Sequence, residues 1–341
     1  MSEPFGTFEG HDVRRITISD GSLTAKVMEW GAVVQDLRLE GHDAPLVLGF
    51  ETFDPYPEHS PYFGAVPGRV ANRIRNARAP LEGRTIELDA NQNGRHHLHG
   101  GAEGLGRRLW KLVDHGPAHA KLQIVSPAGD MGYPGTLTAL CNYVIEGAAL
   151  HVTLTATTDA PTFVNLTHHG YFNLHDGGAT DVLDHSLSID ADAYLAIDAD
   201  AVAGGEPLSV QGTRFDWRDP QPVRRGIDDA DEMPVWDHNY CLSDQRVPMR
   251  EVATLASPDG SLAMTVATTE PGLQFYDGAK VDVPVPGLDG IAYGARSGLC
   301  LETQAWPDAP NNPDYPSILL HPGNTREQKT VFSFHRAAKS P

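Results

Sequence analysis

The chain is poor in cysteine, in basic residues and in long apolar runs. Its three cysteines, Cys141, Cys241 and Cys300, are far apart and odd in number, which disfavours a disulfide framework and a paired-cysteine metal site. No stretch reaches the roughly 18 apolar residues of a membrane-spanning helix, and the N-terminal MSEPFGTFEG lacks the basic and apolar parts of a secretion signal. We therefore expect a soluble, cytoplasmic protein with no membrane partner.

Lysines and arginines number 26 against 45 aspartates and glutamates, so the formal net charge is -19. This charge repels nucleic acid and anionic membranes unless a local basic patch opposes it. The densest basic run, Arg73, Arg75 and Arg78, is too short to do so. We expect no nucleic-acid partner.

Helical periodicity is also scarce, and the segment from Asp219 to Glu232 is where a short helix would fit. Alternating apolar and polar residues are common instead, as in residues 23–27, 150–157 and 262–266, and are typical of strands with one buried face. The 34 glycines and 26 prolines interrupt these patterns at short intervals. The sequence predicts an all-β fold of many antiparallel strands.

The length of 341 residues is compatible with one domain or two, because large all-β folds run past about 200 residues as single units. No internal repeat, low-complexity tract or flexible linker marks a boundary in the sequence. We expect a single domain over residues 1–341.

Two polar runs in the first third, GRVANRI and HHLHGG, contain Asn72, Arg73 and His99. Hydrogen-bonding groups from neighbouring segments suit a ligand with many hydroxyls. Alternatively, the arginines are surface charges and the histidines belong to a solvated loop. A metal site is less favoured, because His97 and His99 would share one face of a strand with no third ligand specified nearby.

In the run NLTHHGYFNL, residues 165–174, alternation separates two neighbouring histidines. His168 shares its parity with apolar residues, as a core histidine does, whereas His169 shares its parity with Asn, Thr and Tyr. Such a polar row is usually the solvent side of a strand. A histidine beside Asn and Tyr is also suited to proton transfer near neutral pH, so His169 is a candidate catalyst.

Further candidates lie in the last third of the chain. Asp237, in WDHNY, would accept ligand hydroxyls or cap a turn, and Gln274, in PGLQFY, has the same two interpretations. Glu302 follows Leu301 and precedes Trp306, so it is a candidate for a desolvated carboxylate of raised basicity, although most Glu side chains are exposed.

In their order along the chain, the runs GRVANRI, LHGG, NLTHHGYFNL, DHNY, PGLQFY and CLETQ resemble the aldose 1-epimerase (galactose mutarotase) family. The resemblance begins at Gly68, continues past Glu302 and covers nearly the whole chain. It implies a large antiparallel β-sandwich, the galactose mutarotase-like supersandwich, acting on a free aldose such as galactose or glucose. It implies neither a cofactor nor a metal. Whether the chain is a monomer or a homodimer stays open.

The resemblance also implies roles for individual residues. Glu302 would be the general base and His169 the general acid. The groups that bind and orient the sugar would be Asn72, Arg73, His99, Asp237 and Gln274.

The sequence departs from the family pattern at three places. His168 stands where Asn is usual, Gly170 stands where Ser is usual, and residues 288–295, which lead into the CLETQ run, differ as well. The parity argument independently favours His169 over His168 as the acid. Gly170 removes a hydroxyl, and the 288–295 segment bears on substrate preference.

Anomer interconversion requires the C1 hydroxyl to lose a proton while the ring oxygen gains one; after rotation about C1–C2 the ring recloses with the roles reversed. Glu and His serve both directions if their surroundings bring both pKa values toward neutrality. Three alternatives stay open: a glycosidase using Asp237 and Glu302, a sugar-phosphate epimerase, which the sparse basic clusters disfavour, and a non-catalytic carbohydrate-binding protein.

Overall fold

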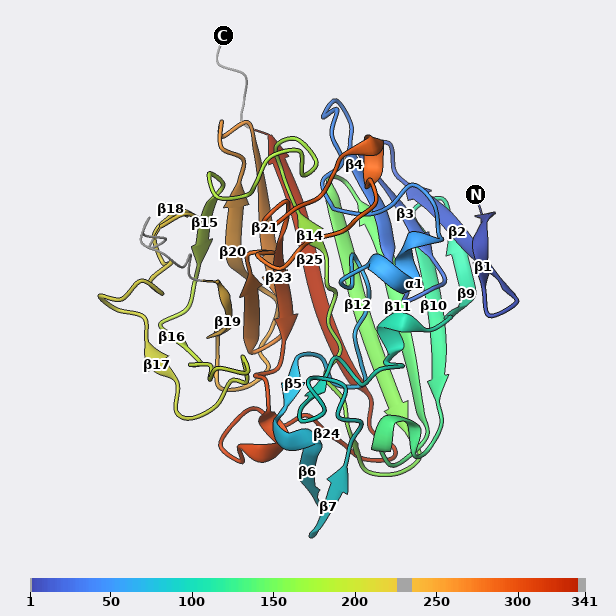
Figure 1. The fold of residues 1–341 in the computed structure, drawn as a ribbon, viewed down its shortest axis with the longest axis vertical. Helices are drawn as coiled ribbons and strands as arrows, with labels where there is room; N and C mark the ends of the chain where they lie inside the picture. Colours follow the sequence, from blue (N-terminus) through green and yellow to red (C-terminus); the bar gives the residue numbers. More distant parts are fainter. Residues whose placement is uncertain (1, 226–234, 337–341) are drawn as a thin grey trace.

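Antiparallel strands dominate the computed structural model, which describes residues 2–225 and 235–336 (Figure 1). The largest sheet has nine strands, in the spatial order β18 (Gln221–Pro222), β15 (Ser186–Ile189), β20 (Arg250–Ala256), β21 (Leu262–Thr268), β25 (Arg326–Arg336), β12 (Ala149–Thr158), β11 (Leu137–Glu146), β10 (His119–Ser126) and β9 (Lys111–Gly116). β25 comes late in the chain but pairs with both β21 and β12, so it joins the two halves of this sheet.

Two further sheets pack on the nine-stranded one. The six-stranded sheet has the order β14 (Tyr171–Phe172), β23 (Leu299–Gln304), β22 (Gly272–Tyr276), β19 (Asp237–Cys241), β16 (Ala193–Tyr194) and β17 (Leu208–Ser209). The four-stranded sheet has the order β1 (Ser2–Phe8), β2 (His11–Ser19), β3 (Leu23–Met28) and β4 (Val34–Leu39). Buried apolar residues of all three sheets belong to one hydrophobic cluster. The architecture is therefore the expected antiparallel β-sandwich.

Alternation along the strands agrees with this layering. In β12, β3 and β21 the apolar residues of the predicted patterns are buried, and their polar neighbours are partly exposed or exposed. In β23 every residue is buried, because residues outside the sandwich cover the second face of this strand. A strand covered on both faces shows no simple alternation of burial.

Shorter elements lie outside the three large sheets. Two-stranded pairs form between β5 (Arg73–Ile74) and β8 (His97–Leu98), β6 (Arg78–Leu81) and β7 (Arg84–Glu87), and β13 (Thr162–Phe163) and β24 (Leu319–Leu320). A short helix, α1, spans Pro55–His59, and single 3-10 turns span Arg75–Ala77, Leu105–Arg107, Asp130–Gly132, Leu288–Gly290 and Ala309–Asn311.

The helix expected between Asp219 and Glu232 is wrong for the part that the structure describes. Residues 219–225 contain the short strand β18 and turns. Pro220 and Pro222 explain this, since proline disfavours the helical conformation of the residue before it and cannot donate a helical hydrogen bond. Residues 226–232 lie outside the described part of the chain.

Within residues 2–225 and 235–336, no helix has the length and apolar character needed to cross a membrane.

Candidate active site

Strand register brings His169 and Glu302 together. β14 pairs with β23 so that Tyr171 lies opposite Cys300. Continuing this antiparallel register by two residues along each chain places His169 opposite Glu302. On its other side, the His169 backbone exchanges hydrogen bonds of 2.8 and 2.9 Å with residues 64–65. The pairing of the neighbouring residues thus brings two positions that are 133 residues apart in the sequence close together.

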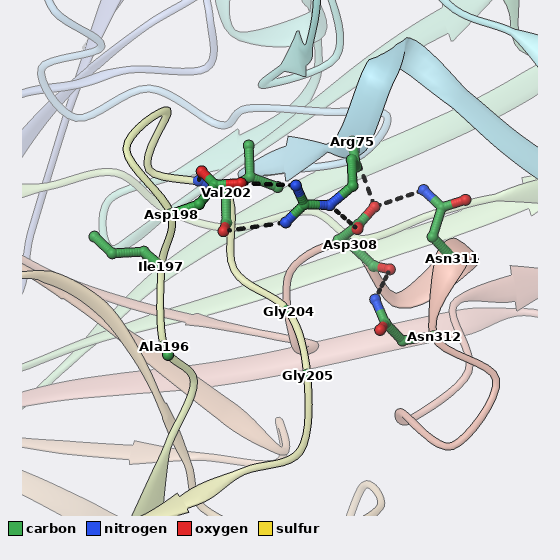
Figure 2. Close-up of a pocket in the computed structure, with 10 residues that line it drawn as sticks. All are labelled: Arg75, Ala196, Ile197, Asp198, Val202, Gly204, Gly205, Asp308, Asn311 and Asn312. Atoms are coloured by element: carbon green, nitrogen blue, oxygen red, sulfur yellow. Dashed lines mark hydrogen bonds and ion pairs between the residues drawn. The ribbon is translucent and has the colours of Figure 1, made fainter.

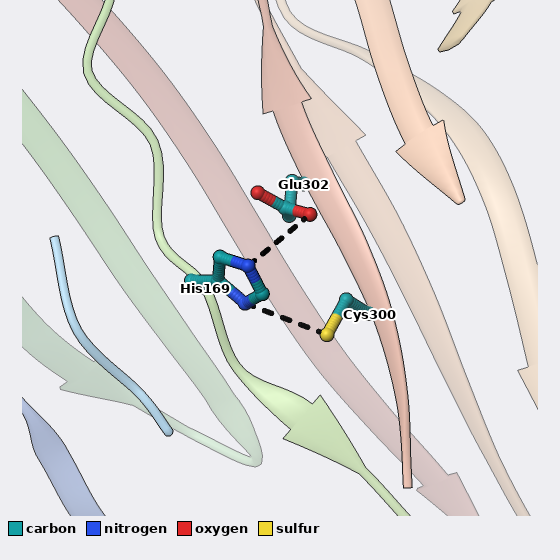
Figure 3. Close-up of side chains that lie close together, drawn as sticks. All are labelled: His169, Cys300 and Glu302. Carbon is teal, nitrogen blue, oxygen red and sulfur yellow. Dashed lines mark hydrogen bonds and ion pairs between the residues drawn. The ribbon is translucent and has the colours of Figure 1, made fainter. Parts of the chain in front are cut away.

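The imidazole of His169 has a defined orientation. Its Nε2 lies 3.7 Å from Glu302 Oε1, and its Nδ1 lies 3.5 Å from Cys300 Sγ (Figure 3). The ring stacks with Tyr62 at 5.9 Å and 19° and with Tyr171 at 5.1 Å and 17°. These aromatic contacts hold the ring plane, so that Nε2 is directed at the carboxylate.

The pair of short strands β5 and β8 supplies a second wall. Asn72 and His99 flank these strands, and both have left-handed backbone conformations, with φ of 60° and 50°. The Asn72 N–H donates to His99 Nδ1 at 3.2 Å. Because Nδ1 is an acceptor, a neutral His99 carries its proton on Nε2, which makes this residue a hydrogen-bond donor.

The third wall comes from β19 and β22. Asp237 accepts a hydrogen bond of 2.7 Å from Gln274 Nε2, and its other oxygen lies 3.7 Å from an Arg73 guanidinium nitrogen. Arg73 in turn donates from Nε to Gln92 at 2.9 Å. Gln274 lies opposite Glu302 in the β22–β23 register. The Asp237 carboxylate is therefore positioned from two sides, by an amide and by a cation.

Burial controls the electrostatics of the site. It raises the pKa of Glu302 well above its ordinary value; Asp237 adds to this rise and Arg73 opposes it. It lowers the pKa of His169 to about 3 and that of His99 well below its ordinary value. A raised pKa makes Glu302 a stronger base once it is ionised, and His169 enters any proton transfer near pH 7 as a neutral imidazole. Among the described residues, Glu302 Oε2 has no hydrogen-bond partner.

Six of the residues singled out from the sequence line one pocket: Asn72, Arg73, His99, His169, Asp237 and Glu302. Gln274 is buried and lies behind Asp237 rather than in the pocket wall. His168, as its parity predicts, packs in the core, against Tyr143 and Phe332.

Sequence reasoning did not assign a role to the other lining residues, Pro61, Tyr62, Leu98, Tyr171, Tyr276 and Lys280. The polar parity of the 165–174 run includes Tyr171, and Tyr276 stands two residues after Gln274, so strand alternation would have found both. Tyr62 and Lys280 lie in irregular segments, where no periodic signal exists.

His169, Cys300 and Glu302 are also a set of metal-ligand types, with one ligand atom from each lying within 4.8 Å of the others. The imidazole, however, turns Nδ1 toward the thiol and Nε2 toward the carboxylate. One ring does not direct both nitrogens at a single ion, so the geometry favours a chain of proton donors and acceptors over a metal centre.

A second cavity lies beyond β5, next to the segment that carries Arg75 (Figure 2). Arg75 pairs with Asp198 at 2.7 Å and with Asp308 at 3.7 Å, and the amides of Asn311 and Asn312 donate to Asp308. These polar groups satisfy one another, so the cavity lacks the opposed acid and base seen at His169 and Glu302.

Comparisons with known proteins identify the family of the chain. The aldose 1-epimerase family model matches residues 14–333. The galactose mutarotase of Bos taurus is 38% identical over 327 residues, covering 94% of each chain, and the aldose 1-epimerase of Escherichia coli strain K12 is 34% identical over 337 residues, covering 96% of each.

Solved structures show the same fold. A GalM/aldose epimerase homologue from C. elegans superposes with a TM-score of 0.88 at 29% identity, over 95% of this chain and 99% of that one. The galactose 1-epimerase of Lactobacillus acidophilus has a TM-score of 0.83 at 24% identity, over 99% of both chains.

The chain belongs to the aldose 1-epimerase family. It is an isomerase with mutarotase activity.

Proposed function

We propose that Glu302 and His169 are the proton-transfer groups for a free aldose bound in the pocket. In one direction Glu302 takes the proton from the C1 hydroxyl while His169 Nε2 donates to the ring oxygen, and the ring opens. After rotation about C1–C2, the opposite transfers close it as the other anomer. The observation that carries this proposal is the placing of the two groups face to face, 3.7 Å apart and buried, in one pocket.

Polar groups of the other walls bind and orient the sugar. His99 is a neutral donor, because its Nδ1 already accepts the Asn72 N–H. Asp237 is an acceptor for sugar hydroxyls, because Gln274 and Arg73 hold its carboxylate in place. Orientation of this kind converts binding energy into rate, since it holds the reacting atoms in line with the acid and the base.

The substrate is an unphosphorylated aldose such as galactose or glucose. A phosphate would need a cluster of cationic groups, whereas the two cations of the wall, Arg73 and Lys280, share it with the carboxyl groups of Asp237 and Glu302, and Arg73 faces Asp237 across 3.7 Å. A glycosidase would use Asp237 and Glu302 as its pair of carboxyl groups, and His169, which faces Glu302 at 3.7 Å, would then have no role.

Polarimetry tests the proposal. Enzyme is added to freshly dissolved α-galactose, α-glucose and a pentose, and the decay of rotation is compared for wild type, Glu302→Gln and His169→Asn. Each substitution should lower kcat by roughly 10²- to 10⁴-fold with a smaller change in KM, because proton transfer occurs in the transition state. Two exposed substitutions, Glu327→Gln and His115→Asn, are the matched controls and should leave the rate unchanged.

The alternatives give other results. A wild-type rate equal to the spontaneous rate for every sugar would contradict the activity, and near-normal kcat in both site variants would contradict the residue roles. Release of an aryl group from an aryl glycoside would favour the glycosidase. Sugar binding without any rate enhancement would favour a carbohydrate-binding protein.

Residues 1–341 form one domain in this proposal, because one hydrophobic cluster includes residues of all three large sheets. The protein works in the cytoplasm, as its three free cysteines suit a reducing compartment. The protein is a monomer or a homodimer, and its molecular mass in analytical ultracentrifugation would distinguish the two.

A further inference from the structure

Cys300 lies on the side of His169 that faces away from Glu302. Its Sγ is 3.5 Å from His169 Nδ1, and its side chain is fully buried (Figure 3). The residue stands two positions before Glu302 on β23, so strand alternation puts both side chains on the same face of the sheet. The imidazole thus lies within reach of the thiol through one nitrogen and of the carboxylate through the other.

We propose that Cys300 is a positioning residue that sets the tautomer of His169: its thiol donates to Nδ1, and the ring proton is thereby held on Nε2, facing Glu302 and the pocket. This role rests on the proposed proton transfer through His169 Nε2. It concerns a contact that Cys300 makes with His169 and not with the sugar.

The tautomer matters because His169 is neutral. A neutral imidazole has one N–H, and only the form with the proton on Nε2 donates to an oxygen bound in the pocket. The alternative tautomer would turn Nδ1–H toward sulfur, a weak acceptor. With Glu302 ionised, as the proposed base must be, it would also leave two acceptors, Nε2 and Glu302 Oε1, facing each other at 3.7 Å.

The surroundings of the thiol keep it a donor. Burial raises the pKa of Cys300 well above its ordinary value, and the nearby Glu302 carboxylate acts in the same direction. The sulfur therefore retains its proton near neutral pH. Because aromatic stacking with Tyr62 and Tyr171 fixes the ring, the Nδ1 lone pair does not turn away from the sulfur.

Long-range ¹H–¹⁵N spectra of the sugar-free, histidine-labelled protein test the inference. His169 is assigned by the signal missing from His169→Asn, and wild type should show the Nε2–H pattern. Cys300→Ser keeps a donor and should keep this pattern with kcat within about threefold of wild type. Cys300→Ala should show the Nδ1–H form as well, with kcat lowered by roughly 3- to 10-fold, the range expected for one lost hydrogen bond, and KM unchanged.

Cys141→Ser is the matched control, since Cys141 is also free and fully buried but lies in the core of the sandwich. It should leave the His169 signal and kcat of the folded enzyme unchanged. An Nδ1–H pattern in wild type, or unchanged tautomer and kcat in Cys300→Ala, would overturn the inference, as would a serine variant that behaves like the alanine variant. Because the spectra need no turnover, they are read separately from polarimetry on His169→Asn, which tests the proposed function.

Discussion

Substitution of Gly170 by Ser should destabilise this protein, and substitution of His168 by Asn should relieve much of that cost. A Cβ atom at position 170 would lie 3.0 Å from His168 Nε2 and 3.1 Å from two ring carbons of Phe172. Carbon pairs attract best at roughly 3.5–4.0 Å, so each of these contacts would be repulsive. The two departures from the family pattern at 168 and 170 are therefore physically linked: the larger ring occupies the space that a side chain at 170 needs.

The expected magnitudes follow from this geometry. Overpacking of a well-filled core costs about 1–3 kcal/mol, and Gly170→Ser belongs in this range because both neighbours are buried aromatic rings. Asn is too short to reach the position of His168 Nε2. In the His168→Asn background the serine should therefore cost about 1 kcal/mol less, although contacts with Phe172 persist.

Urea unfolding, followed by tryptophan fluorescence, gives the four free energies of this double-mutant cycle. Gly294→Ser is the control, because a Cβ there would meet no atom within 4 Å. Its effect should stay within about 0.5 kcal/mol. If the effects at 168 and 170 add to within about 0.5 kcal/mol, the steric explanation is refuted.

The free energy of unfolding should fall as the pH drops from about 6.5 to about 4. Burial lowers the pKa of His185 to about 4, so in this range the unfolded chain binds the proton and the folded protein does not. For such a residue the loss is about 1.4 kcal/mol per pH unit. Urea titrations at several pH values should show a flatter loss for His185→Gln, whereas the exposed His11→Gln should match wild type. For Glu302 the pH dependence of stability has the opposite sign. Its raised pKa means that the folded state holds the proton more tightly than the unfolded chain, so stability falls as pH rises. Glu302→Gln should therefore stabilise the protein at pH 7, and this gain should vanish below about pH 4. An equal gain at every pH would contradict this linkage. Gln274→Ala should raise KM roughly 3- to 10-fold through loss of the hydrogen bond to Asp237, and an unchanged KM in polarimetry would show that Gln274 does not orient that carboxylate.

Local sequence patterns predicted the strand class well, because alternation reports burial on one face. β12 is the clearest case, since its buried and partly exposed residues follow the predicted alternation from Leu150 to Ala156. The same logic separated His168 from His169. It did not predict that both parities of the 165–174 run would be buried, because the cover on the polar side comes from distant segments such as residues 64–65.

The face-to-face placing of His169 and Glu302 was beyond local reasoning. It depends on the register between β14 and β23, which long-range hydrogen bonds determine and no spacing in the sequence encodes. The grouping of the site residues came from resemblance to a family. Local patterns also missed Tyr62, because it contacts His169 from an irregular segment, where its φ is a left-handed 71°.

The central place of β25 in the nine-stranded sheet has a consequence for biosynthesis. A ribosome makes residues 326–336 after every other described strand, yet β12 and β21 obtain their shared neighbour only from this segment. Until then both strands expose unpaired backbone edges, which invite intermolecular pairing. Cotranslational folding therefore leaves the two halves of the sheet unjoined until β25 is made. Nonsense mutations between residues 269 and 325 should yield aggregating fragments rather than a smaller working enzyme.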